Sequence, residues 1–191
     1  DLLAWIEQDC IWANTLVDRI VSESLSPVGA VAEPYALWAI QKVPGLVAPC
    51  IHPDVRLVEE LHPYELLKLG VLNLSHTFLV DLWLRNGRPI ELKLVSEIMQ
   101  HPDYLLALQT LLTEEVLPVL KVLLPDQDPE AYRQTVYERF SNPFLKHHLE
   151  DIAQNHEEKV RRRILMVREH SHRLFPNRPT PLLDSCLPEV A

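Results

Sequence analysis

The sequence predicts a mainly α-helical protein in which a few strands precede the helices. Three observations support this fold class. Sixteen prolines leave four gaps long enough for helices after about residue 55, and the longest gaps carry leucines at helical spacing. The first 54 residues are rich in β-branched and aromatic residues and are interrupted by prolines, a pattern typical of short strands. A length of 191 residues suits one domain, or one and a fraction.

The order of these patterns predicts the domain organisation. Because strands come first and helices follow, we expect residues 1–54 to be the strand and loop remnant of a larger sheet domain. A helical domain is expected over residues 55–175. Residues 176–191 are proline-rich and lack periodicity, so an extended end is expected there.

Helices are expected where proline-free stretches carry apolar periodicity or helix start and stop signals. The first, over residues 64–88, has a broad apolar band and ends at Asn86-Gly87. A short helix follows over residues 91–99. Pro102 and Pro129 are placed to open two further helices, over residues 102–117 and 128–142. The last gap, residues 144–176, holds two helical pieces, of which 157–174 is the more polar.

Composition excludes several classes of function. The net charge of −9, from 18 Lys plus Arg against 27 Asp plus Glu, argues against a nucleic-acid surface. No apolar run approaches the roughly 20 residues of a membrane span. Cys10, Cys50 and Cys186 form no CxxC pair, which disfavours a disulfide framework and a cysteine zinc site and favours a cytoplasmic protein. Four glycines cannot make GxGxxG, so a nucleotide cofactor would need residues from elsewhere.

Lys68, Asn73 and His76 are polar residues that stand among leucines and valines in the most apolar predicted helix. At about 100° per residue they can line one concave surface. A lysine held against apolar groups loses proton affinity and can exchange a proton with a substrate hydroxyl, while an amide can donate to the oxygen that becomes negative. Structural roles are the alternative: a lysine extending to water, an asparagine bonded to its own helix, and a histidine satisfied in the core.

Four segments carry a family resemblance. Residues 62–68 are HPYELLK and residues 72–76 are LNLSH, while residues 14–20 are NTLVDRI and residues 139–143 are RFSNP. In their order along the chain they resemble the motifs of the polyol-specific long-chain dehydrogenases, which include mannitol 2-dehydrogenase, fructuronate reductase and tagaturonate reductase. The similarity is greatest to the tagaturonate reductase branch. The resemblance implies a helical substrate domain like the C-terminal domain of 6-phosphogluconate dehydrogenase, with a Rossmann domain missing from this chain.

The resemblance also implies a reaction and its residues. It implies hydride transfer between a small polyol or hexuronate substrate and NAD or NADP, without a metal. Lys68 would be the general acid/base, Asn73 would polarise the reacting oxygen, and His76 would contact substrate. Further substrate-binding positions that it implies are Asn14 as a second donor to that oxygen, Arg139 for a hydroxyl or carboxylate, Glu33, and Asn142. Asp18 and Arg19 are expected to form a structural ion pair or a loop clamp.

Two other interpretations compete with this one. His147 and Asp151, four residues apart, have a spacing that can bind zinc on a helix, and His147-His148, His156 and His170-Ser171-His172 add further imidazoles. The second alternative is a truncated, non-catalytic helical interaction module. Because the dinucleotide fingerprint is missing, these 191 residues are not expected to catalyse hydride transfer alone. The exact sugar, the choice between NAD and NADP, and the oligomeric state are left open by the sequence.

Overall fold

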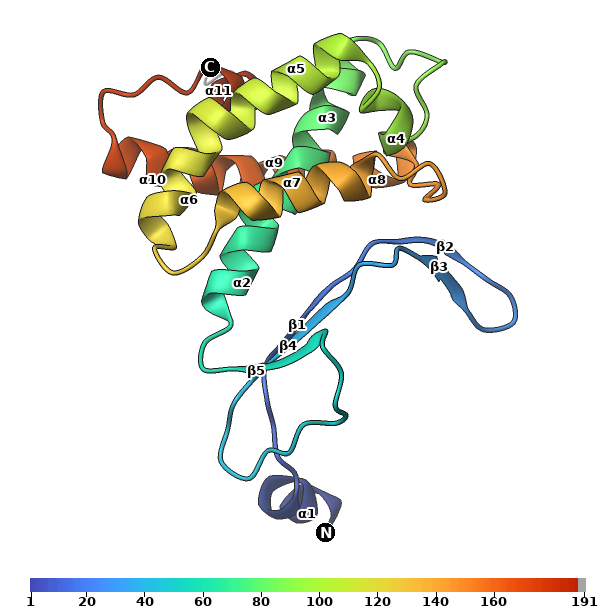
Figure 1. Cartoon of the computed structure of the whole chain (residues 1–191), viewed down its shortest axis with the longest axis vertical. Coiled ribbons are helices and arrows are strands. Elements are labelled where there is room, and N and C mark those ends of the chain that lie inside the picture. The colour runs from blue at the N-terminus through green and yellow to red at the C-terminus, as the bar shows by residue number, and fades with distance from the viewer. Residues whose placement is uncertain (189–191) are drawn as a thin grey trace.

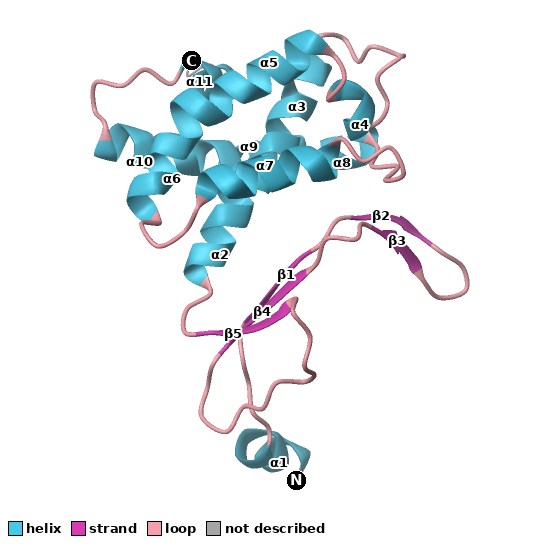
Figure 2. Ribbon diagram, in the orientation of Figure 1, coloured by secondary structure: helices cyan, strands magenta, loops and turns pink. Residues whose placement is uncertain are grey.

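The computed structural model describes residues 1–188 and consists of a strand-containing segment followed by a helical bundle. Figure 1 shows the bundle at one end of the long axis and the N-terminal helix at the other, with the strands between them. The strands are confined to the first part of the chain, as Figure 2 shows. The predicted mainly α fold class is confirmed. No helix within residues 1–188 is long and apolar enough to cross a membrane.

The strand segment contains a small mixed sheet and a separate hairpin. β4 (Leu37–Gln41) is the central strand, antiparallel to β1 (Thr15–Asp18) and parallel to β5 (Val55–Val58). β2 (Val21–Ser24) and β3 (Ala30–Ala32) form the antiparallel hairpin. In β4 Leu37 and Ala39 are buried and Trp38 is exposed, and the adjacent Ile40 is buried as well, so the strand is covered on both faces towards its end.

Two features of this segment differ from the sequence-based expectations. Residues 2–9 form a helix, α1 (Leu2–Asp9), where strands and loops were predicted. The Asp1 side chain caps it by accepting a hydrogen bond from the amide of Ala4 at 3.0 Å, a local signal that the prediction missed. Residues 55–58 belong to the sheet as β5, so the helices begin at His62 and not at Val55.

The long central helix runs from the sheet into the bundle. It comprises α2 (His62–Leu67), a π-helical segment η1 (Lys68–Asn73) and α3 (Leu74–Arg85). In η1 the amide of Leu74 donates to the carbonyl of Leu69 five residues earlier, so the wider turn replaces the 100° spacing assumed from the sequence. Nine of the twelve residues of α3 are buried, which explains the broad apolar band.

The middle helices are longer or shorter than predicted. α4 covers only Val95–Ile98 of the helix expected at 91–99, and Leu94 pairs with His148 in an isolated β-bridge. α5 (Pro102–Thr110) continues through π-helical η2 (Leu111–Val116) into α6 (Leu117–Leu123). Pro118 was expected to end this helix near residue 117. It is accommodated because the π-helical segment ends before it and Pro118 falls in the first turn of α6.

The remaining helices close the bundle around α3. α7 (Pro129–Phe140) matches its prediction, with the Asp128 side chain accepting from the amide of Ala131 at 3.0 Å. The last gap contains α8 (Leu149–Ala153) and a continuous helix made of α9 (His156–Val160), η3 (Arg161–Leu165) and α10 (Met166–Leu174). The expected extended end is wrong in part, because it contains α11 (Pro181–Ser185). Residues 189–191 of that prediction lie outside the described residues.

The two parts differ in how they bury apolar side chains. The core lies among the helices, where fully buried leucines from η2, α6 and α3 meet Ile164 and Leu183. Large apolar side chains in the first 58 residues are often exposed: Leu2, Leu3, Trp5, Ile11, Trp12, Val17, Val21, Leu25, Val28, Trp38, Val47 and Ile51. A three-stranded sheet with this much exposed apolar surface is typical of a domain edge that packs against further structure.

A buried carboxylate fixes α11 to the bundle, and its removal should be measurable. Glu115, 3% exposed, accepts from the backbone amides of Leu182 and Leu183, both at 2.9 Å. Glu115→Ala would leave these two amides without partners, so the free energy of unfolding should fall by about 1–3 kcal/mol in urea denaturation. Glu114→Ala, at the exposed neighbouring position, should change it by less than about 0.5 kcal/mol. Equal effects of the two variants would show that Glu115 does not anchor α11.

Candidate functional site

A cavity of about 310 Å³, here called the Lys68 cavity, lies where the strand segment meets the bundle. It is lined by β1 and β2 residues, by the central helix, and by the start of the last helices. The lining residues are Asp18, Arg19, Ile20, Val21, Ser22, Lys68, Leu72, Asn73, His76, His147, Asp151, Ile152, Lys159 and Arg163. The structure therefore brings together Lys68, Asn73 and His76, the three residues singled out on the central helix.

Lys68 lies at the start of η1 and is half-buried. Its Nζ donates to the backbone carbonyl oxygen of Val17 at 2.6 Å, which ties the amine to the end of β1. Burial lowers the pKa of Lys68; Asp18 opposes this shift, and the positive charges of Arg139 and Arg163 add to it. A lysine in this state gives up its proton more readily than an exposed one and can accept a proton from a substrate hydroxyl.

Asn73 ends η1 one turn beyond Lys68. Its backbone carbonyl accepts hydrogen bonds from Thr77 Oγ1 at 3.0 Å and from Arg163 Nη1 at 3.3 Å. No side chain within residues 1–188 bonds to its amide group, which lines the cavity. The amide can therefore donate to an oxygen of a bound molecule.

His76 forms the deep wall of the cavity and is 5% exposed. Its ring stacks on Phe140 with centroids 4.0 Å apart and meets His147 edge-on at 4.7 Å. Within the described chain its Nε2 has no hydrogen-bond partner. Burial holds the pKa of His76 well below 6.5, and His147 and Arg163 lower it further, so the imidazole is neutral at pH 7. A neutral, unpartnered ring nitrogen is suited to a substrate hydroxyl.

Arg139 is committed to a buried cluster of charges and does not line the Lys68 cavity. Its guanidinium donates to Asp18 Oδ1 at 2.8 Å and Oδ2 at 3.1 Å, and to Glu33 Oε1 at 2.8 Å and Oε2 at 3.0 Å. All three side chains are at most 4% exposed. In the structure Arg139 and Glu33 therefore bind each other, whereas the family resemblance implied that each contacts substrate.

Of the two roles expected for Asp18 and Arg19, the ion pair between them is not formed, whereas a loop clamp agrees with their contacts. Asp18 pairs with Arg139 and also accepts from Tyr132 Oη at 2.5 Å. Arg19 Nε donates to the backbone carbonyl oxygen of Glu33 at 2.9 Å. The cluster joins β1, the loop after β3 and α7, so it clamps the strand segment onto the bundle.

Asn14 and Asn142 make their hydrogen bonds outside the Lys68 cavity. Asn14 is exposed and its Nδ2 donates to Gln41 Oε1 at 3.4 Å. Asn142 Oδ1 accepts from the amide of Phe144 at 3.0 Å, within the turn that follows α7. Neither side chain lines the Lys68 cavity.

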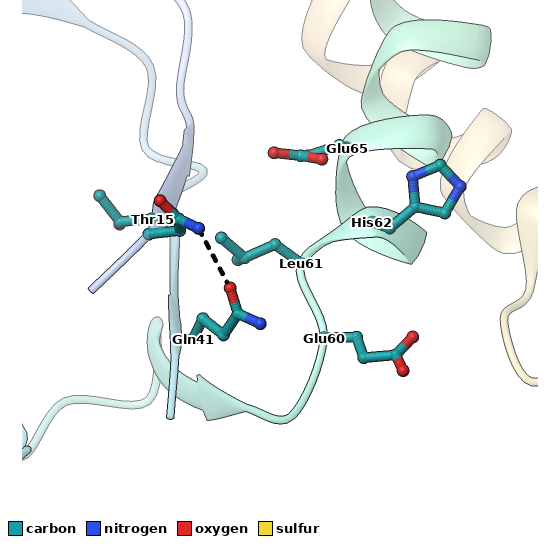
Figure 3. A pocket seen from close by; sticks show the side chains of 7 residues that line it. Thr15, Gln41, Glu60, Leu61, His62 and Glu65 are labelled. Carbon is teal, nitrogen blue, oxygen red and sulfur yellow. Dashed lines mark hydrogen bonds between the residues drawn. The ribbon is translucent and has the colours of Figure 1, made fainter. Parts of the chain in front are cut away.

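Asn14 instead lines a second cavity of about 590 Å³ between the sheet edge and the start of α2. Figure 3 shows Glu65 and Gln41 on opposite sides of this cavity, with a dashed line at the hydrogen bond to Gln41. Its lining is polar and carries two carboxylates, Glu60 and Glu65, and no lysine or arginine. Although it is the larger hollow, it contains neither Asn73 nor His76, so the proton-exchanging groups belong to the Lys68 cavity.

Sequence reasoning missed Lys159 and Arg163 as residues of the site. They lie four residues apart on one face of the last long helix and both line the Lys68 cavity. The sequence shows a basic run at residues 161–163, but this run stands among acidic residues and carries no local signal of which arginine faces inward. Which of these three arginines faces inward depends on the packing of the helix.

The histidines proposed for a metal site are not arranged as predicted. His147 precedes α8, so its spacing to Asp151 is not that of two residues on a helix. Within residues 1–188 no group of three or more His, Cys, Asp or Glu side chains could hold a metal ion. Burial lowers the pKa of His147 to about 4, so this ring is neutral near pH 7.

The glycines do not form a dinucleotide cradle. Gly29 and Gly45 lie in loops of the strand segment, and Gly87 ends α3. Gly70 lies within η1, where a Cβ would come within 3.1 Å of Leu120. The glycines of this chain therefore do not make the turn that would hold the pyrophosphate of a nicotinamide cofactor.

The Lys68 cavity combines a half-buried lysine, an amide and a neutral imidazole, which are groups that can exchange a proton with a hydroxylated molecule and bond to it. Residues 60–175 match the mannitol dehydrogenase C-terminal domain, and the chain belongs to this family. That range begins just before α2 and ends just after α10.

Relatives extend the match into the strand segment. The chain is 33% identical over 181 residues to the altronate oxidoreductase of Bacillus subtilis, covering 84% of this chain and 36% of the relative. It is 32% identical over 186 residues to the D-mannonate oxidoreductase of Escherichia coli, covering 86% of this chain and 36% of the relative. The Pseudomonas fluorescens mannitol 2-dehydrogenase, solved with NAD and D-mannitol, superposes with a TM-score of 0.76 at 23% identity, covering 97% of this chain and 39% of that one. The chain thus spans little more than a third of the length of each of these three proteins.

Proposed function

We propose that this chain is the substrate-binding and catalytic part of an NAD(P)-dependent oxidoreductase that interconverts a sugar alcohol or hexonate and its keto sugar. The observation that carries the proposal is the Lys68 cavity, in which Lys68, Asn73 and His76 share one hollow. Family membership supports the reaction class, because the relatives are named oxidoreductases of altronate and mannonate.

The residues have separate roles in this proposal. Lys68 accepts the hydroxyl proton during oxidation and returns it during reduction. The side chain of Asn73 donates to the oxygen on which negative charge develops as that proton leaves. His76 lines the cavity and orients the sugar by contacting a neighbouring hydroxyl. The nicotinamide, when bound by another domain, exchanges the hydride.

The exposed apolar surface of the strand segment supports a larger assembly. We infer that the part of the protein that binds the dinucleotide packs against the first 58 residues, where most of the exposed large apolar side chains lie. This contact would enclose the cavities beside β1. It would also change the surroundings of Asn14. The proposal therefore retains Asn14 as a second donor to the reacting oxygen.

The proposed function is tested on the complete gene product with a panel of hexonates and polyols, each assayed with NAD and NADP. Nicotinamide-linked turnover of at least one member is expected. Absence of turnover with every substrate in both directions, from a folded protein, would favour the non-catalytic interaction module. The panel also selects between the two nicotinamides.

A change at Asn73 should affect the chemical step specifically. Asn73→Ala in the complete gene product is expected to lower kcat by about a hundredfold, the usual effect of losing one donor to a developing oxyanion. The dissociation constant of the nicotinamide, measured by fluorescence titration, should be unchanged. A loss confined to nicotinamide binding would contradict the role of Asn73 at the reacting oxygen.

A further inference from the structure

The structure assigns a carboxylate-binding subsite to Arg163 and Lys159, on the wall of the Lys68 cavity. We propose that this pair receives the carboxylate of a hexonate and selects the acid over the uncharged sugar alcohol. The inference rests on the proposed function, because it concerns the substrate of the same cavity.

Arg163 and Lys159 are cations without acidic partners. Within residues 1–188 neither side chain forms an ion pair, whereas Arg161, on the same helical run, is paired with Glu158 at 3.9 Å. Both side chains are half-buried, and both line the cavity. A half-buried cation without a counter-charge is stabilised by an anion that enters the cavity.

Neutral hydrogen bonds hold the two cations in place. Arg163 Nη1 donates to Thr77 Oγ1 at 3.0 Å and to the carbonyl of Asn73 at 3.3 Å. Lys159 Nζ donates to the carbonyl of Ile152 at 2.7 Å. These bonds occupy only part of the five guanidinium N–H groups and the three ammonium N–H groups, so donors are left for a ligand. Burial lowers the pKa of Lys159, and the charge of Arg163 lowers it further, as expected for two cations that lack an anion.

The acidic residues of the cavity do not neutralise this pair. Asp18 is bound to Arg139 and Tyr132 inside the buried cluster. Asp151 is exposed and forms no ion pair within the described residues. The wall formed by Arg163 and Lys159 therefore has an excess of positive charge. A carboxylate neutralises this positive charge and accepts charge-assisted hydrogen bonds from the two cations, which a hydroxymethyl group cannot do.

The size and layout of the cavity fit a sugar acid. Its volume of about 310 Å³ is at the lower end of the range for small-molecule sites. Arg163 bonds the backbone of Asn73, so the proposed carboxylate subsite adjoins the proposed oxygen donor. A carboxylate at one end of the carbon chain can contact Arg163 while a hydroxyl further along the chain reaches Lys68.

The test compares a hexonate with the matching hexitol in the complete gene product. Michaelis constants for D-mannonate and D-altronate are measured beside those for D-mannitol and D-altritol. Arg163→Gln is expected to raise the hexonate constants by about ten- to a hundredfold and to leave the hexitol constants within a few fold. Arg163→Lys should recover part of the hexonate preference. Arg162→Gln, which removes the same charge from the exposed neighbouring position, should have no effect on either substrate.

The outcomes separate this inference from the proposed function. If Arg163 acted only by positioning Asn73, Arg163→Gln would lower hexonate and hexitol turnover equally, and the carboxylate subsite would be wrong. If the wild-type protein turned over hexitols and its Michaelis constants for hexonates were no lower than those for hexitols, the subsite would be overturned. The proposed function would still stand. Absence of turnover with all four substrates and with the wider panel would defeat both. Circular dichroism and thermal midpoints establish that each variant is folded.

Discussion

Lys68→Ala in the complete gene product is expected to lower kcat by a hundredfold or more. The expectation follows from the position of the amine, because it lines the cavity with Asn73 and His76 and is held by the carbonyl of Val17 at 2.6 Å. Removal of a general acid/base typically costs about 10²–10⁴-fold. The measurement is steady-state turnover in both directions, with substrate and nicotinamide saturating.

The pH dependence of the oxidation rate tests the same role of Lys68 without relying on the absolute rate. Burial lowers the pKa of Lys68, so the amine becomes free to accept a proton below the pH at which an exposed lysine would. Rates of alcohol oxidation should therefore rise with pH through this lowered pKa and then level off, and this rise should be absent in Lys68→Ala. Lys121→Ala, which removes an exposed lysine paired with Glu130, is the control and should retain both rate and profile. Retention of most turnover by Lys68→Ala would remove Lys68 as the acid/base.

Arg139→Met is expected to give the largest loss of stability. Asp18 and Glu33 would stay buried without their counter-charge, and breaking a buried ion cluster in this way typically costs about 3–5 kcal/mol. The measurement is the free energy of unfolding from urea denaturation in a Trp83→Phe background, in which the three tryptophans left, Trp5, Trp12 and Trp38, report the N-terminal segment and circular dichroism reports the helices. The strand segment should open at lower urea than in the wild type, because the cluster joins it to α7.

A matched variant distinguishes this role from one in substrate binding. Arg161→Met removes an exposed arginine whose side chain is 72% exposed, and its effect on stability should be less than about 0.5 kcal/mol. If Arg139→Met unfolded like the wild type but raised the Michaelis constant, Arg139 would contact substrate as the family resemblance implied. Such a result would require the cluster to rearrange when substrate binds.

The helices were predictable because their signals are local. Pro129 with Asp128, and Asn86-Gly87, mark a start and a stop within a few residues, and the structure places helix ends there. The helix predictions were wrong where tertiary contacts or a weaker local signal determined the structure. Pro118 was taken to end a helix, yet the preceding π-helical turn lets the chain continue. α11 forms where Glu115, distant in sequence, supplies acceptors for its first amides.

The sequence by itself determined the fold class, the family resemblance, and the gathering of Lys68, Asn73 and His76. These three lie within nine residues of one helix, so helical geometry keeps them close together, although the π-helical turn of η1 sets their final spacing. The tertiary structure decided the partners of Arg139, which come from β1 and the loop after β3, more than 100 residues away in the chain. It also decided that Arg163 and not Arg162 faces the cavity. A charged side chain can be salt-bridged, solvated or poised for a ligand, and only the packing of distant segments selects among these states.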